Sequence, residues 1–184
     1  MLNQDDIRVI KTAKNIKEAF FALLAQKEYE DITVQDILDK AQINRTTFYK
    51  HYPNKNALAK SLVDEFKQQV FYPALEQRFS LATLEFVQSV TPLMIQNREK
   101  LRLLWKIETP KIHLKQDMLL LVKQKYMEML YEESLNKNID IEFQRHIYAS
   151  LGLATMNFMV STEKTINLVE MLTNMRFLLK KMIL

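Results

Sequence analysis

Hydrophobic positions recur every three or four residues through most of the chain, which is the pattern of amphipathic helices. Within residues 7–26 this spacing places Ile10, Ile16 and Phe20 on one face. Very few segments alternate at every second position, which argues against a β-sheet. Further along, the same spacing predicts helices at about 82–96, 97–107, 112–135, 141–161 and 165–182. The pattern therefore predicts an all-α fold.

The segment after residue 32 predicts two short helices joined by a tight turn. Thr33 followed by Asp36 three residues later is the pattern of a capping box, which begins a helix. Asn44 can cap the next helix, which is predicted from Arg45 to about His51. The apolar Ile43 stands in the turn, where two helices must meet. This arrangement has the geometry of a helix–turn–helix element.

A proline break and a third capping residue follow. Tyr52 precedes Pro53 and is expected to be extended, and Asn54 caps a fourth helix that runs to about Val70. Pro73 is expected to close this block, although one helix can be continuous across the boundary. The predicted domains are 1–70 and 71–184.

The composition limits the classes of protein to which this chain can belong. A chain of 184 residues with 48% apolar and 26% charged residues is globular. It has no cysteine, which excludes disulfides, a thiol nucleophile and cysteine-ligated zinc, and fits a cytoplasmic location. The N-terminus lacks the pattern of a signal peptide, and the longest apolar runs are too short to span a membrane. We expect a cytoplasmic protein without a membrane partner.

The sequence shows no enzyme motif. No glutamate lies three residues before His51, His113 or His146, and no HExxH occurs, so known carboxylate–histidine metal motifs are absent. A single glycine excludes a glycine-rich phosphate loop. No serine has an identifiable base. We therefore expect neither catalysis nor a metal or cofactor.

Charge indicates a different function. The stretch from Lys40 to Lys60 contains five basic residues and no acidic one, within a chain of formal net charge +4. In a helix–turn–helix element the residues at the start of the second helix reach base edges in the major groove. Arg45 can make a bidentate contact to guanine, Thr46 can contact a thymine methyl group, and Tyr49 can reach a base or a phosphate. The predicted partner is therefore double-stranded DNA.

The other predicted contacts are to phosphate or at helix starts. Thr47, Lys50 and His51 suit phosphate oxygens, and the starts of the helices at Thr33 and Lys55 favour an anion. The predicted DNA-binding residues are Thr33, Asn44, Arg45, Thr46, Thr47, Tyr49, Lys50, His51 and Lys55. The alternative is a helical adaptor whose basic face docks an acidic protein partner, because basic runs are often only a solvated face and helical hairpins are common.

This segment resembles the N-terminal domain of TetR-family transcriptional regulators over about residues 7–66. The family pattern usually has a glycine after the first helix and another in the recognition turn, where this chain has Glu28 and Gln42. Either position would carry strain if its φ were positive. The resembling residues are Ile32, Thr33, Val34, Asp36, Ile37, Ala41, Ile43, Asn44, Thr46, Thr47, Phe48, Tyr49, His51, Tyr52, Asn54, Lys55 and Leu58.

The resemblance also implies an all-helical C-terminal domain that forms a homodimer through its last two helices, here about 141–161 and 165–182, and that holds a small-molecule effector. Gly152 would allow another helix to approach closely. Arg102, Trp105 and His113 are candidates for the effector site, against the simpler reading of Trp105 as a core aromatic. The expected function is a ligand-responsive repressor on a palindromic operator.

Overall fold

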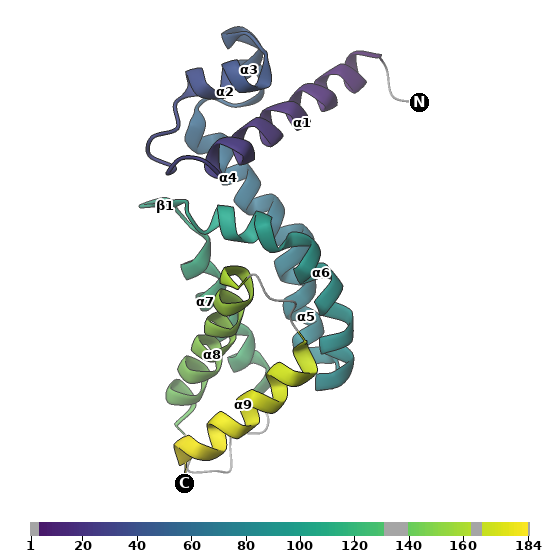
Figure 1. Ribbon diagram of the computed structural model, residues 1–184, viewed down its shortest axis with the longest axis vertical. Coiled ribbons are helices and arrows are strands. Elements are labelled where there is room, and N and C mark those ends of the chain that lie inside the picture. The colour runs from purple at the N-terminus through teal and green to yellow at the C-terminus, as the bar shows by residue number, and fades with distance from the viewer. Residues whose placement is uncertain (1–3, 131–139, 163–166, 184) are drawn as a thin grey trace. The chain divides into compact units, whose positions relative to one another are not determined.

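The computed structural model describes residues 4–130, 140–162 and 167–183, and these are almost entirely helical (Figure 1). The all-α prediction is confirmed, with one antiparallel pair of two-residue strands as the sole sheet in the described part of the chain. The elements are α1 (Gln4–Leu24), α2 (Val34–Ala41), α3 (Arg45–His51), α4 (Lys55–Phe66), the π-helix η1 (Lys67–Phe71), α5 (Tyr72–Ser80), α6 (Thr83–Leu104), β1 (Glu108–Thr109), β2 (Ile112–His113), α7 (Leu114–Leu130), α8 (Ile141–Ser161) and α9 (Leu168–Ile183).

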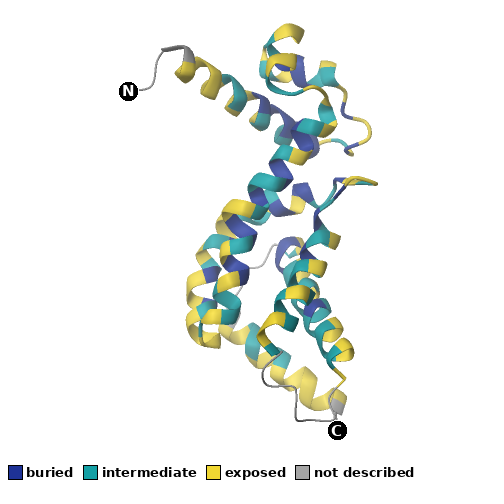
Figure 2. Ribbon diagram, turned by 180° about the vertical axis from the view of Figure 1, so that it is seen from behind, coloured by how far each residue is buried: buried dark blue, intermediate teal, exposed yellow. Residues whose placement is uncertain are grey.

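The chain divides into two compact units. Unit 1 is Met1–Lys67 with Lys100–Leu114, and unit 2 is Gln68–Glu99 with Lys115–Leu184. Unit 1 therefore combines α1 to α4 with the end of α6 and the strand pair, which follow much later in the sequence. Its core is well buried, as Figure 2 shows for α1 and α4. The fully buried side chains there include Ile16, Phe20, Leu24, Ile37, Phe48, Leu58, Leu62, Phe66, Leu101, Leu104 and Ile107.

Lys106, which follows α6, connects residues 100–114 to the end of α1 through hydrogen bonds. The ammonium of Lys106 donates to the carbonyl oxygens of Leu24, at 3.0 Å, and Lys27, at 3.1 Å. These carbonyls lie at the end of α1, where a helix has unpaired acceptors and favours a cation. The same ammonium lies 3.0 Å from a carboxylate oxygen of Glu28. The end of α6 is thus held by both apolar burial and a charged cap.

Of the two outcomes allowed at Pro73, a break or a continuous helix, the structure has the continuous helix. The chain remains helical from α4 through η1 into α5, and Pro73 lies in the first turn of α5. A proline near the start of a helical segment is tolerated, because its fixed φ suits a helix. The π-helix η1 lies directly before α5. Its wider turn shifts the helical hydrogen bonds by one residue just before Pro73.

The predicted division into helices at 82–96 and 97–107 was also wrong, because α6 runs through both with Pro92 in its interior. An interior proline costs about 3 kcal/mol. The cost is offset by burial along the whole helix, since Val87, Val90 and Met94 are buried in unit 2 and Leu101 and Leu104 in unit 1. The strand pair, in which Glu108 pairs with His113 and Thr109 with Ile112, was not predicted.

The remaining predicted helices are present with small shifts in their bounds. α8 agrees with the predicted 141–161, and Asp140 caps it by accepting a hydrogen bond from the backbone N–H of Phe143 at 3.0 Å. α7 begins at Leu114, and the last part of the predicted helix, 131–135, lies outside the described residues. No helix in the described ranges is long and apolar enough to cross a membrane.

Candidate functional site

The start of α2 is a complete capping box. The hydroxyl oxygen of Thr33 accepts a hydrogen bond from the N–H of Asp36 at 3.1 Å, and the Asp36 carboxylate accepts one from the N–H of Thr33 at 2.8 Å. Lys27 also donates to that carboxylate, at 3.0 Å. These contacts, with the Thr33 backbone bond the largest, lower the pKa of Asp36 to about 2. The carboxylate fixes the first turn of α2 at neutral pH.

The turn between α2 and α3 uses the left-handed conformation. Gln42 has φ 54° and ψ 47°, and the N–H of Ile43 donates to the carbonyl oxygen of Leu38 at 3.1 Å, as in a Schellman motif. Among the described residues Gln42 is the one non-glycine position with positive φ, so Glu28 does not share this geometry. The concern about strain at a missing glycine is thus confirmed for Gln42 and does not apply to Glu28.

The short helix α3 is anchored on one side and exposed on the other. Asn44 caps it by accepting a hydrogen bond from the N–H of Thr47 at 2.8 Å, and Phe48 is fully buried. Arg45, Thr46 and Lys50 are exposed, and Tyr49 is 46% exposed while its ring meets the edge of Phe48 at 5.5 Å between centroids. Arg45, Thr46, Tyr49 and Lys50 are therefore accessible to solvent, whereas the predicted phosphate contacts Thr47 and His51 are half-buried.

Arg45 lies against the neighbouring helix and has no counter-ion among the residues that the structure describes. Its guanidinium donates to the side-chain oxygen of Gln35 on α2 at 3.3 Å, and the Gln35 amide donates to Asp39 at 2.8 Å. The partner of Arg45 is thus a neutral amide. The contact orients the guanidinium at the start of α3 and leaves its charge for an anionic or acceptor-rich ligand.

Besides Asn44, which caps α3, Thr33 and Lys55 already make hydrogen bonds within the protein. The Thr33 hydroxyl is used in the capping box, where it also donates to Asp36 at 2.9 Å. The Lys55 ammonium donates to the carbonyl oxygens of Tyr29, at 2.7 Å, and Glu30, at 3.3 Å. Burial lowers the pKa of Lys55, while the acidic groups of Glu30, Asp31 and Asp36 oppose that shift. An ammonium has three donors, so a phosphate contact from Lys55 remains compatible with these bonds.

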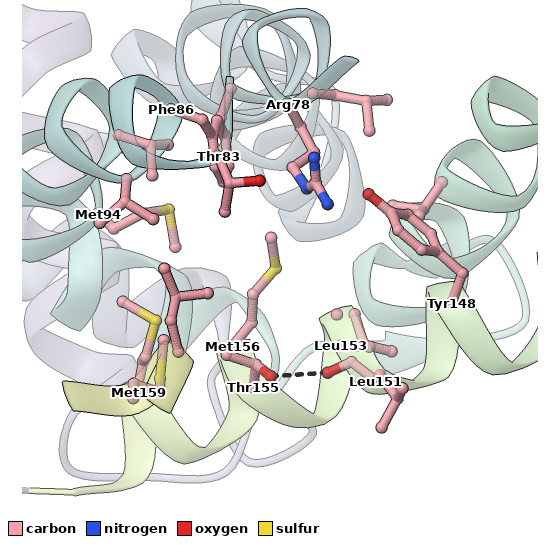
Figure 3. A pocket seen from close by; sticks show the side chains of 18 of the residues that line it. Arg78, Thr83, Phe86, Met94, Tyr148, Leu151, Leu153, Thr155, Met156 and Met159 are labelled. Carbon is pink, nitrogen blue, oxygen red and sulfur yellow. Dashed lines mark hydrogen bonds between the residues drawn. The ribbon is translucent and has the colours of Figure 1, made fainter. Parts of the chain in front are cut away.

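Unit 2 holds an apolar pocket that the sequence did not predict. Its volume is about 350 Å³, and its walls come from η1, α5, α6, α7, α8 and α9 (Figure 3). Sequence reasoning missed it because leucine and methionine at helical spacing indicate a packed core equally well. The lining residues are Phe71, Ala74, Leu75, Arg78, Phe79, Thr83, Phe86, Val87, Val90, Met94, Val122, Tyr148, Leu151, Gly152, Leu153, Thr155, Met156, Met159, Met171, Leu172, Met175 and Leu179.

The pocket changes the interpretation of several residues. Arg102, Trp105 and His113, the predicted effector-site candidates, belong to unit 1 and do not line it. Gly152 borders the cavity, and outside its own helix backbone and chain neighbours no atom of this chain lies within 4 Å of a Cβ added there. No cluster of metal-ligating side chains occurs in the part of the chain that the structure describes.

The family model for bacterial regulatory proteins of the tetR family matches residues 16–62, which span most of α1 through α4. Those residues form the helix–turn–helix element with its exposed α3. This part of the chain is therefore similar to the N-terminal domain of tetR-family regulators.

One relative matches a longer stretch of this chain. The HTH-type transcriptional regulator YxbF of Bacillus subtilis (strain 168) is 29% identical over 154 residues, which are 79% of this chain and 37% of YxbF. The chain therefore spans little more than a third of the length of that relative.

Solved structures share the fold. A TetR transcriptional regulator from Streptococcus agalactiae 2603V matches with a TM-score of 0.67 and 24% identity, covering 92% of this chain and 94% of that one. A gamma-butyrolactone receptor, described as an ArpA-like protein, matches with a TM-score of 0.56 and 17% identity over 82% of this chain and 83% of its own. At these identities the likeness is one of fold. It extends beyond α1–α4 to the helices that enclose the pocket.

Proposed function

We propose that the protein is a transcriptional repressor that binds a palindromic operator as a homodimer and leaves it when a small molecule occupies the pocket of unit 2. The observation that carries the proposal is the exposed face of α3. Arg45, Thr46, Tyr49 and Lys50 lie there, in a stretch without acidic residues, while Phe48 fixes the helix to the core. Direct readout requires such a face, because bases are recognised by side chains from the start of a helix in the major groove.

The proposed DNA-binding residues divide by role. Arg45, Thr46 and Tyr49 read bases, and Thr47, Lys50 and His51 contact phosphates. Asn44 and Thr33 act mainly through the geometry of the helix starts that they cap. Lys55 combines a structural role with a phosphate contact. We keep the division into a DNA-binding domain, 1–70, and a dimerisation and effector domain, 71–184, with the addition that residues 100–114 pack in unit 1.

Homodimerisation through α8 and α9 is supported by the apolar side chains that these helices leave exposed. Phe143 and Phe158 on α8 are 63% and 58% exposed, and Phe177 and Met182 on α9 are 64% and 71% exposed. Figure 2 shows α9 exposed along most of its length. Exposed apolar side chains gathered on two helices are typical of a protein interface. A second copy would bury them and present two α3 helices to DNA.

Release by a ligand is supported by the path of two helical segments. α6 contributes Phe86, Val90 and Met94 to the pocket wall and then continues into unit 1, where Lys100 lies 3.8 Å from Glu65 on α4. The helical path α4–η1–α5 likewise begins in unit 1 and reaches the pocket. A ligand that binds better to one position of these helices would shift the population toward that state and change the placement of α3.

The test is selection of bound duplexes from a random DNA pool by the purified protein. Recovery of a palindrome whose half-sites lie about one helical turn apart, about 34–36 Å, supports the proposal, because dimer symmetry is copied in the operator. Arg45→Ala should lose the enrichment, whereas Lys14→Ala, which removes an exposed charge on α1, should keep it. Absence of any enriched sequence, combined with salt-dependent binding to an acidic protein, would favour the adaptor instead.

A further inference from the structure

The pocket of unit 2 has one polar end. The guanidinium of Arg78 and the hydroxyl groups of Thr83 and Tyr148 point toward one another at that end, whereas the rest of the wall is apolar (Figure 3). Thr155, which also lines the pocket, has its hydroxyl committed to the carbonyl oxygen of Leu151 at 2.8 Å. The donors available to a ligand are therefore concentrated where Arg78 lies.

Arg78 is a cation without a carboxylate partner in the described residues. Its guanidinium carbon lies 5.5 Å from the ring centroid of Phe86 and 5.4 Å from that of Tyr148, both suitable for cation–π contacts. Glu76, two positions earlier on α5, is paired with Lys125 at 2.8 Å. A charge held between aromatic rings in an apolar wall is stabilised most by an anion that pairs with it directly.

Tyr148 is placed to assist such an anion. Its ring lies 4.6 Å from that of Tyr126 and 5.8 Å from that of Phe79 between centroids, so its orientation is set by packing. Tyr126 in turn donates to Gln144 at 3.0 Å. Burial raises the pKa of Tyr148, which keeps its hydroxyl protonated and able to donate a hydrogen bond at neutral pH.

The remainder of the wall favours a flexible aliphatic body. Methionine side chains from three helices, Met94 on α6, Met156 and Met159 on α8, and Met171 and Met175 on α9, adapt to irregular shapes. The volume of about 350 Å³ is near the lower limit for small-molecule sites, so the ligand must be small. A single guanidinium matches one carboxylate through two parallel hydrogen bonds.

We propose that the effector is a medium-chain aliphatic monocarboxylate, whose head group pairs with Arg78 and receives a hydrogen bond from Tyr148, and whose chain fills the methionine-lined part of the pocket. This inference rests on the proposed function for its regulatory meaning, but ligand binding itself is measurable without DNA. The geometry excludes an alkyl cation as the ligand, since Arg78 would repel it in a low-dielectric site. An uncharged alcohol or lactone of equal length would leave the guanidinium unpaired.

The experiment measures calorimetric binding of the full chain to alkyl carboxylates of six to sixteen carbons, and to the alcohol, gamma-lactone and trimethylammonium analogues of the best one. We expect an optimum at intermediate length, with the alcohol and lactone about tenfold or more weaker, because a charged hydrogen bond is lost. Arg78→Met should weaken carboxylate binding by a similar or larger factor while the alcohol is unaffected. Tyr148→Phe should have a smaller effect of the same kind.

Two further variants serve as controls for Arg78→Met. Arg98→Met removes an arginine of α6 that does not line the pocket, and should bind the carboxylate as the natural protein does. Arg78→Lys preserves the charge without the bidentate geometry, and should retain part of the affinity. Carboxylate binding that is absent below millimolar concentration, equalled by the alcohol or lactone, or unchanged in Arg78→Met would overturn the proposal. A protein that binds the carboxylate but no DNA would instead refute only the proposed function.

Discussion

The ammonium of Lys55 donates to the carbonyl oxygen of Tyr29 at 2.7 Å and also lies 4.3 Å from the centroid of the Tyr29 ring. A residue at the start of α4 is therefore tied to the loop that precedes α2. Tyr29 is itself buried against Phe20, with a ring-centroid distance of 6.3 Å, and its hydroxyl donates to Asn56. These contacts connect the loop before α2 to the start of α4.

Lys55→Met should therefore lower the free energy of unfolding as well as weaken DNA binding. The carbonyl groups of Tyr29 and Glu30 would lose a charged donor, which we expect to cost about 1–2 kcal/mol. Chemical denaturation measures this loss directly. Lys60→Met is the control, because Lys60 pairs with Asp64 one turn away on an exposed face and should contribute well below 1 kcal/mol.

DNA binding by Lys55→Met also distinguishes a purely structural role of Lys55 from a direct contact with a phosphate. If the Lys55 ammonium also touches a phosphate, the slope of log affinity against log salt should fall by about one per subunit. An unchanged slope with lowered stability would show that Lys55 only positions its surroundings.

Arg45→Ala should relax sequence specificity more than it weakens non-specific binding. Arg45 lies exposed at the start of α3, with neutral Gln35 as its partner, so its charge and donors are available to a base. Loss of a bidentate base contact should cost about 1–3 kcal/mol at one base pair in each half-site. Affinities for the selected operator and its single-base variants measure this cost. Equal losses on operator and random DNA would identify Arg45 as a phosphate contact.

Gln42→Gly should raise stability. Gln42 has φ 54°, a region that costs residues with a Cβ about 1–2 kcal/mol, whereas glycine loses somewhat more backbone entropy on folding. The net gain should be up to about 1 kcal/mol in urea denaturation. Lys40→Gly, within α2 itself, should instead destabilise by about 1 kcal/mol. If both substitutions destabilise equally, the left-handed turn carries no strain.

Acid should weaken the start of α2 through Asp36. The pKa of Asp36 in the folded protein is about 2, below its ordinary value of 3.8, because the Thr33 N–H and then Lys27 stabilise the carboxylate. A lowered carboxylate pKa contributes stability above the ordinary pKa, and this contribution is lost as pH falls from about 3.8 through about 2. Melting temperatures of the natural protein and Asp36→Asn should therefore converge across that range. A difference that stays constant from pH 6 to pH 2 would contradict the role of the charge.

The sequence by itself determined the features that depend on neighbouring residues. Thr33, Asn44 and Asn54 cap the helices that they were expected to cap, and Tyr52 before Pro53 is extended. Each of these effects joins groups at most a few positions apart, so the local sequence contains all the participants. The exposed α3 likewise follows from a local pattern, in which Phe48 is the buried member of a polar and basic helix.

Only the tertiary structure decided the features that join distant segments. Lys106 caps the end of α1 although it lies 82 residues from Leu24, and residues 100–107 complete a core that begins at the N-terminus. Pro92 is tolerated inside α6 because burial along the whole helix outweighs a local preference. The pocket arises where η1 and helices α5 to α9 leave space between them. No periodicity in the sequence distinguishes a side chain that fills such a space from one that borders it.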